Sequence, residues 1–106
     1  MELTGKQKRY LRSKAHHLDP IFQIGKNGLN KEVIVQIGEA LEKRELIKIN
    51  LLQNTDESVD EVAAEIERAL GCDAVQVIGR VIVLFSPSSQ EKYQRISTEL
   101  PAKKKK

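Results

Sequence analysis

Residues 74–85 read AVQVIGRVIVLF, and this stretch indicates the class of fold more firmly than any other part of the chain. Two runs of mainly β-branched and apolar residues, 74–78 and 81–85, flank the pair Gly79-Arg80. A two-residue connection with glycine first is typical of a type II′ β-hairpin, because that turn needs a positive φ at its first central residue. The stretch therefore predicts two antiparallel strands.

The chain before this hairpin alternates between helical and extended patterns. Thr4 with Gln7, and Ser58 with Glu61, have the spacing of a helix-starting capping box, and Asn30 is also suited to cap a helix. Apolar residues recur at helical spacing after each cap, and β-prone runs lie between the helices. The predicted elements are a helix at 5–17, a strand at 21–24, a helix after Asn30, a strand at 46–52 and a helix between Ser58 and Gly71.

The order α-β-α-β-α-β-β predicts a small two-layer α/β sandwich around a four-stranded mixed sheet. Right-handed crossovers would place the second and third helices on the same face of the sheet. Gly38 lies in the middle of the second helix, which favours close packing against a neighbouring element. The chain has 106 residues, enough for one domain. We expect that domain at 1–87, followed at 88–106 by an extension with a frayed helix and a disordered lysine tail.

Charge is distributed unevenly along the chain. Residues 1–31 hold seven Lys/Arg against two Asp/Glu, whereas residues 49–102 hold four against nine. On a wheel of helix 5–17, Leu11, Ala15 and Leu18 share the apolar face. A basic segment on an acidic body is typical of a surface that docks a polyanion, although ordinary solvated charge is the alternative. The basic face of the helix holds Lys6, Lys8, Arg9, Arg12 and His16.

The loop Gly25-Lys26-Asn27-Gly28 connects a predicted strand to a predicted helix. Backbone N–H groups beside a helix N-terminus suit phosphate, glycine permits close approach, and Lys26 adds a charge. The same residues could equally form a plain β-to-α turn. Because helix 5–17 ends shortly before this strand, we expect its basic face to lie beside the loop and form a continuous positive track, which Arg80 would extend.

Several classes of function are disfavoured by the sequence. The loop lacks the GKS or GKT ending of a nucleotide-binding P-loop. His16 and His17 are adjacent, which is poor geometry for one metal ion, and Cys72 is the only cysteine, without a partner to activate it. No apolar run is long enough to cross a bilayer. We expect a cytoplasmic protein that is not an enzyme and binds no cofactor, metal or small-molecule substrate.

The segments LTGKQKRYLRSKAHHLDPIFQIGKNGL, ELIKI and VQVIGRVIVLF closely resemble the bacterial YhbY family, the stand-alone form of the chloroplast RNA splicing and ribosome maturation (CRM) domain. The resemblance covers residues 2–87. It implies an RNA-binding domain similar to the C-terminal domain of translation initiation factor three, with a loop like the GxxG loop of KH domains. Family members resemble assembly factors for precursors of the large ribosomal subunit.

The resemblance thus implies an RNA-binding protein whose partner is rRNA in precursor large ribosomal subunits, and we expect it to be a monomer. Four aromatic residues are too few for a stacking surface of the RRM or OB kind, so binding should rest on phosphates and RNA shape. A KH-like regulator of mRNA or small RNA and a basic protein-interaction module are the alternatives. The candidate RNA-contacting residues are Gly25, Lys26, Asn27, Gly28, Lys6, Lys8, Arg9, Arg12, His16, Lys31 and Arg80.

Overall fold

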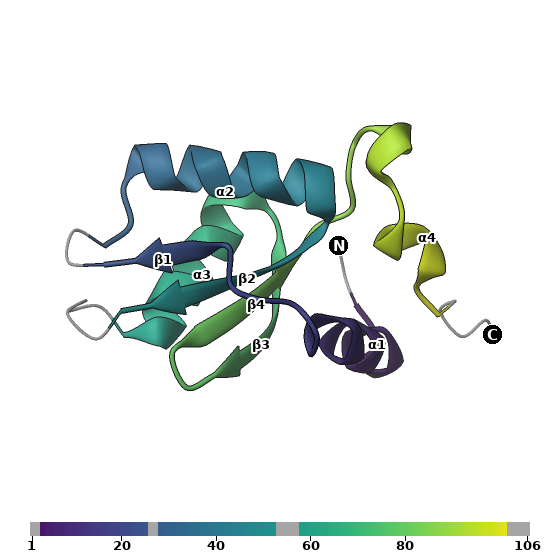
Figure 1. The fold of residues 1–106 in the computed structure, drawn as a ribbon, viewed down its shortest axis with the longest axis horizontal. Coiled ribbons are helices and arrows are strands. Elements are labelled where there is room, and N and C mark those ends of the chain that lie inside the picture. Colours follow the sequence, from purple (N-terminus) through teal and green to yellow (C-terminus); the bar gives the residue numbers. More distant parts are fainter. Residues whose placement is uncertain (1–2, 26–27, 53–57, 102–106) are drawn as a thin grey trace.

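The computed structural model describes residues 3–25, 28–52 and 58–101. Its element order is the predicted one, followed by two short helical segments (Figure 1). The elements are α1 (Gly5–Ala15), β1 (Phe22–Ile24), α2 (Lys31–Arg44), β2 (Leu46–Leu51), α3 (Val59–Leu70), β3 (Asp73–Ile78), β4 (Val81–Phe85), the 3-10 turn η1 (Glu91–Tyr93) and α4 (Ile96–Glu99).

The four strands form one mixed sheet in the order β1-β2-β4-β3, which confirms the predicted fold class. β1 is parallel to β2, whereas β4 is antiparallel to both of its neighbours. The β3–β4 hairpin closes between Ile78 and Val81 as predicted. Gly79 has a φ of 57° and Arg80 does not share this positive φ, which is the pattern of a type II′ turn.

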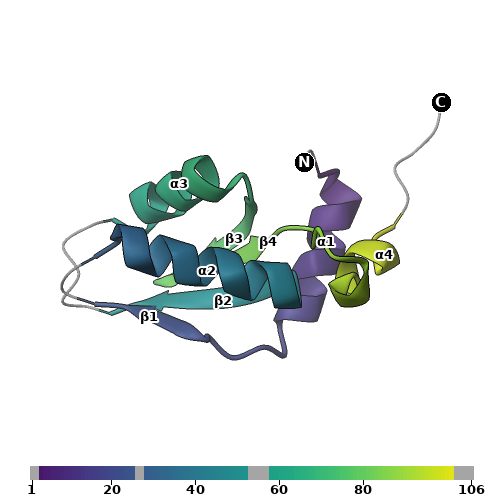
Figure 2. The ribbon, with the colours of Figure 1, turned by 90° about the horizontal axis from the view of Figure 1, so that it is seen from above.

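Helices cover both faces of the sheet, but unequally. α2 and α3 lie together on one face, as the crossover rule predicts (Figures 1 and 2). Strand residues alternate between the faces, so Ile47, Ile49 and Ile82 pack under α2 and α3. α1 packs on the opposite face against a second buried cluster, which contains Leu11, Ala15, Leu46, Val75, Val83 and Phe85.

Local side-chain bonds explain where the helices begin. At the start of α1, the Thr4 N–H donates to Gln7 Oε1 (3.0 Å), and the Gln7 N–H donates to Thr4 Oγ1 (3.1 Å). The Asn30 carbonyl side chain accepts from the Val33 N–H at α2, and Ser58 Oγ accepts from the Glu61 N–H at α3. Each bond satisfies a donor that the first helical turn cannot pair internally.

Two details of the helices differ from or extend the sequence-based expectation. α1 ends at Ala15 and not at residue 17, since the Leu18 N–H turns back to the Ala15 carbonyl (2.9 Å) before Pro20. Leu18 consequently leaves the apolar face and is 36% exposed. At Gly38 the expected close packing is present, because a Cβ there would lie 3.2 Å from Leu70 Cδ2.

Residues 88–101, here called the C-terminal arm, pack against the N-terminal helix α1. Ile96 and Leu100 lie against the α1 cluster. Gln7 is buried, and its Nε2 donates to the Pro101 carbonyl (2.9 Å). The arm thus forms part of the same hydrophobic layer as α1, and Figure 1 shows α4 beside that helix.

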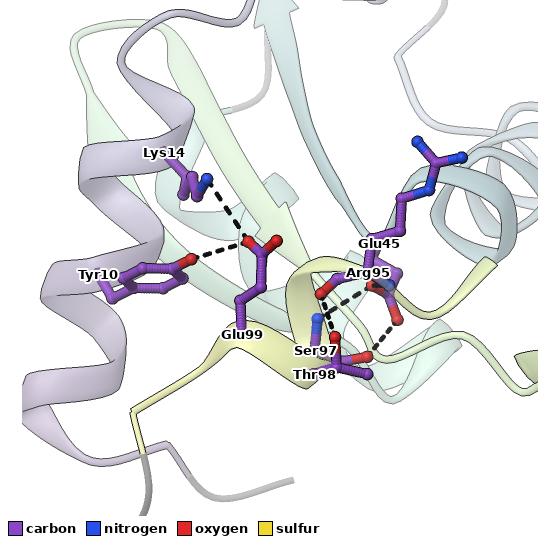
Figure 3. Close-up of polar contacts among 7 residues, drawn as sticks. All are labelled: Tyr10, Lys14, Glu45, Arg95, Ser97, Thr98 and Glu99. Carbon is purple, nitrogen blue, oxygen red and sulfur yellow. Dashed lines mark hydrogen bonds and ion pairs between the residues drawn. The ribbon is translucent and has the colours of Figure 1, made fainter.

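The buried carboxylate of Glu45 anchors the arm (Figure 3). It accepts hydrogen bonds from the N–H groups of Ser88 (2.7 Å), Arg95 (2.9 Å) and Ser97 (3.0 Å), and from Ser97 Oγ (2.6 Å). Burial by itself would raise the pKa of Glu45, but these hydrogen bonds outweigh it and leave the pKa below its ordinary value. Glu45 therefore holds the arm as an ionised residue.

Candidate nucleic-acid interface

α1 presents a basic face to solvent. Its apolar side chains, Leu11 and Ala15, are buried on the sheet, which turns the opposite side of the helix outward. The helix is anchored by its capping box at one end and by the arm along its flank, so the positions of its charges are fixed by the fold. The predicted residues Lys6, Lys8, Arg9 and Arg12 are all exposed, as is His16 just beyond the helix.

These cations are not equivalent, because some also serve the fold. β3 carries a bulge between Ala74 and Gln76, and a bulge leaves its extra residue outside the ladder. The carbonyl of that residue, Val75, accepts a hydrogen bond from Arg12 Nε (3.1 Å). Arg12 therefore ties α1 to the sheet and has less freedom to reach a phosphate.

Lys8 lies within the electrostatic reach of Asp73. Burial raises the pKa of the Asp73 carboxyl, and the positive charge of Lys8 opposes this rise. Asp73 Oδ2 is a buried oxygen without a hydrogen-bond partner in the described part of the chain.

Lys14 is paired with the arm. Its Nζ lies 3.5 Å from Glu99 Oε1, and Tyr10 Oη donates to the same oxygen at 2.9 Å (Figure 3). The hydrogen bond from Tyr10 and the charge of Lys14 lower the pKa of Glu99. Within residues 3–25, 28–52 and 58–101, Lys6, Lys8 and Arg9 have neither a hydrogen-bonded nor an ion-paired side chain, which makes them the most available cations of α1.

The loop at residues 25–28 contains a closed turn. The Gly28 N–H donates to the Gly25 carbonyl at 2.9 Å, and Gly28 is buried with a φ of 64°. This amide is therefore used by the turn, whereas the sequence led us to expect it to be free for phosphate. Lys26 and Asn27 lie outside the described residues. Lys31 is exposed in the first turn of α2, immediately beyond the loop.

Arg80 lies at the same end of the sheet as this loop. Its Nε and Nη2 donate to the carbonyls of Leu51 (3.0 Å) and Leu52 (2.9 Å), and the Leu52 N–H in turn donates to the Ile24 carbonyl (2.8 Å). The guanidinium thus fastens the hairpin turn to the end of β2. Arg80 was expected to extend the positive track, and these hydrogen bonds give it a structural role.

The predicted continuous track from α1 to the loop is wrong, because the two lie at opposite ends of the sheet (Figures 1 and 2). The strand register gives the reason. α1 packs on Leu46 and Phe85, which pair with each other at one end of the sheet, whereas Ile24 pairs with Leu51 at the other. β1 therefore carries the chain away from α1 before the loop begins.

Polar residues of β1 and β2 lie on the sheet face between these two regions. Lys48 and Asn50 follow Leu46 at intervals of two residues and so share its face of the sheet. Both are partly exposed, and Gln23 on β1 is exposed. Lys48 thus contributes a cation between the basic face of α1 and the loop.

Other candidate chemistry finds little support in the geometry. The rings of His16 and His17 make an edge-on contact with centroids 5.4 Å apart. In the described residues no group of three or more His, Cys, Asp or Glu side chains could hold a metal ion. Cys72 is buried, and burial raises the pKa of its thiol to about 11. No described helix is long and apolar enough to cross a membrane.

A further cluster of cations was not predicted from the sequence. Lys43 and Arg44 end α2, and Arg95 approaches them from the C-terminal arm to line a common cavity. The only sequence signal was the charge itself, since basic residues in a last helical turn are ordinary and nothing in the pattern places the arm beside them.

Comparison with known proteins gives one consistent family. Residues 3–86 match the family described as the CRS1 / YhbY (CRM) domain. The chain is 56% identical over 90 residues to "Probable RNA-binding protein YqeI" of Bacillus subtilis, which covers 85% of this chain and 94% of that protein. It is 39% identical over 105 residues to "Probable RNA-binding protein MJ0652" of Methanocaldococcus jannaschii, covering 97% and 76%.

A solved structure has the same fold. The solution structure of the hypothetical protein SAV1595 from Staphylococcus aureus superposes with a TM-score of 0.74 at 50% sequence identity. The match covers 94% of this chain and all of that one. The fold seen here is therefore shared with a protein of experimentally known structure.

Proposed function

The chain belongs to the CRS1 / YhbY (CRM) domain family, and on that premise we propose that it is a non-enzymatic RNA-binding protein. The observation that carries the proposal is the basic face of α1, which holds Lys6 and Arg9 exposed and unpaired within the described residues. The names of its relatives support RNA as the ligand. The YhbY resemblance further supports rRNA in precursors of the large ribosomal subunit, whose assembly the protein would assist.

The mechanism is electrostatic docking on the sugar-phosphate backbone. Lysine and arginine side chains replace counterions around phosphates, which favours binding without reading base sequence. α1 supplies one contact region and residues 25–31 the other, with Lys48 between them. Because these regions lie at opposite ends of the sheet, they fit a structured RNA that crosses the α1 face of the molecule better than a short single strand.

Separate charge reversals in the two regions test the proposal. The double variant Lys6→Glu/Arg9→Glu addresses α1, and Lys26→Glu addresses the loop. Each should weaken binding to precursor large-subunit rRNA at least about tenfold, and the α1 double variant should reduce the slope of log affinity against log salt by about two. Lys6 and Arg9 are preferred over Arg12, whose Nε is hydrogen-bonded to the sheet.

Arg68→Glu is the matched control, since Arg68 is exposed on the acidic helix α3. It should leave affinity within about twofold. Sucrose-gradient fractionation with crosslinking then identifies the particle and the RNA segment that the wild type contacts. If both basic regions are reversed in a folded protein and rRNA binding persists unchanged, this interface is wrong; association that survives RNA digestion would instead indicate protein contacts.

A further inference from the structure

A groove lies on the side of the molecule where α2, the α1–β1 connection and the C-terminal arm meet. Its main cavity has a volume of about 410 Å³, within the usual range of about 300–1,000 Å³ for ligand pockets. A second hollow of about 310 Å³ adjoins it and shares Leu18 and Arg44. Arg95 and Ile96 line the main cavity, and both lie beyond residues 3–86, the part of the chain that matches the family.

The main cavity has a strongly positive lining. Lys43, Arg44 and Arg95 all line it and are exposed, and none has an ion pair within the described residues. Cations at the end of a helix are common because they interact with its C-terminal carbonyls, and this accounts for Lys43 and Arg44. It does not account for Arg95, which comes from a separate segment. Three cations and no carboxylate line the cavity.

Arg95 is held in place through its backbone. Its N–H donates to Glu45 Oε1, while Figure 3 shows its guanidinium directed away from that carboxylate. The bond therefore fixes the position of Arg95 without consuming its side-chain charge. Two guanidinium groups and one ammonium, provided by α2 and the anchored arm, form a site suited to a phosphate.

The remaining walls are aromatic and aliphatic. Tyr93 is half-buried, and the Lys92 ammonium lies 5.1 Å from the centroid of its ring. Leu18 is one of the exposed large hydrophobic residues, and Ile96 is partly buried beside it. An aromatic ring next to aliphatic groups favours a planar base, since bases stack on such surfaces with little dependence on their identity.

We propose that this groove binds one unpaired nucleotide of an RNA, with its base against Tyr93, Leu18 and Ile96 and its phosphate on Arg44 and Arg95. The inference rests on the proposed RNA-binding function and adds a second kind of contact to it. α1 and the loop bind paired backbone without regard to sequence, whereas the groove selects RNA that has a nucleotide outside the stack. An RNA helix with a single-nucleotide bulge is the simplest ligand with both features.

The test uses two RNA hairpins of the same stem, one fully paired and one with a single bulged 4-thiouridine. Fluorescence anisotropy should show that the full-length protein binds the bulged hairpin about tenfold more tightly. Tyr93→Leu keeps an apolar side chain but removes the ring, and should abolish the preference while leaving affinity for the paired hairpin within about twofold. Photocrosslinking should place the bulged base on the groove residues.

Further variants separate this proposal from the proposed function. Arg44→Gln/Arg95→Gln should reduce the preference for the bulge, whereas Lys6→Glu/Arg9→Glu should weaken both hairpins equally and retain it. Arg68→Gln is the charge control. Equal binding of both hairpins by the wild type, or a preference that survives in folded Tyr93→Leu protein, overturns the groove and leaves the proposed function standing. Binding of free uridine monophosphate more tightly than the bulged hairpin also overturns it.

Discussion

Glu45 combines two features that rarely occur together in one residue. It is the C-cap of α2 with a φ of 67°, a backbone conformation that residues other than glycine rarely adopt. Its carboxylate is fully buried. The strained backbone is maintained because the carboxylate satisfies three N–H groups of the arm. One ionised side chain thus supplies four of the hydrogen bonds that hold the arm.

We predict that Glu45→Gln destabilises the protein by about 2–4 kcal/mol, because a neutral amide turns an NH₂ group toward donors and loses charged hydrogen bonds worth about 1.5–3 kcal/mol each. Urea unfolding measures the loss, and hydrogen exchange at the amides of Ser88, Arg95 and Ser97 localises it. Glu39→Gln, at an exposed position of the same helix, should have little effect. Unchanged protection of the three amides would show that Glu45 does not anchor the arm.

The same carboxylate predicts an acid dependence of stability. Its pKa in the folded state is below the ordinary value of 4.5, so its contribution is fully present above that value and is lost as pH falls through the lower, folded-state pKa. Unfolding free energy measured between neutral pH and pH 3 should fall in the wild type. The part of this fall that Glu45 causes should be missing in Glu45→Gln, and two parallel pH profiles would contradict the assignment.

Cys72 gives a prediction about reactivity. Its Sγ lies 3.9 Å from the Ile66 carbonyl, and its buried thiol has a pKa of about 11, so at pH 8 only about one molecule in a thousand carries a thiolate. We expect a thiol-specific reagent such as Ellman's reagent to label the native protein only at the rate at which local or global unfolding exposes Cys72. Protein in urea, as the control, should react at once. Rapid labelling of the native state would indicate an accessible nucleophile.

At this scale the sequence predicts some roles and conceals others. Thr4 and Asn30 act within three residues of themselves, so their capping was predictable from spacing alone. Glu45 binds backbone N–H groups 43 to 52 residues away. Every residue except proline offers such a donor, and no pattern of residue types can therefore reveal it.

Among the elements, α2 and α3 pack closely at Gly38. A Cβ at this position would meet Leu70 Cδ2 at 3.2 Å, so a small displacement of one flexible side chain is needed. Gly38→Ala should change the unfolding free energy by less than about 1 kcal/mol, because the gain in helix propensity of about 1 kcal/mol offsets that displacement. Thermal and urea unfolding measure the difference.

Gly38→Leu is the informative companion to this substitution. A branched side chain cannot fit between the helices without separating them, and overpacking costs about 1–3 kcal/mol. We expect clear destabilisation, with loss of exchange protection in α2 and α3 before α1. If Gly38→Leu is as stable as Gly38→Ala, the two helices do not pack as closely as the 3.2 Å contact implies.

Element order was predictable, but the distance between functional elements was not. Periodicity located each helix and strand, and crossover handedness placed α2 and α3 on one face. The expectation that α1 lies beside the 25–28 loop used closeness in sequence as a guide to closeness in space. The pairing of Ile24 with Leu51, which local sequence does not encode, places the loop at the end of the sheet far from α1.

At the scale of the whole molecule, the C-terminal arm links α1 to the end of α2. Ile96 and Leu100 bury apolar surface against α1, and Glu45 and Gln7 hydrogen-bond the arm. A chain that ends at residue 87 should therefore lose several kcal/mol of stability, with α1 losing exchange protection first. Hydrogen exchange and thermal unfolding measure both effects.

A chain that ends at Pro101 is the control for this truncation. It retains every contact of the arm that the structure describes, so its stability should match the full chain. A chain ending at residue 87 that melts like the full chain would show that the arm is dispensable for folding. The family match ends at residue 86 and does not include the arm. The periodicity of the arm sequence is weak, and it did not predict that Ile96 and Leu100 complete the hydrophobic cluster of α1.

The placement of α1 has a consequence for how the protein is made. Apart from Leu3, the residues outside α1 that bury this helix, from Leu46 to Leu100, follow it in the chain. While the polypeptide is being synthesised, α1 is thus produced before most of its packing partners. It spends that interval as a basic amphipathic segment beside the phosphate-rich walls of the translating ribosome. The element best suited to an anionic ligand is thus translated before most of the residues that bury it.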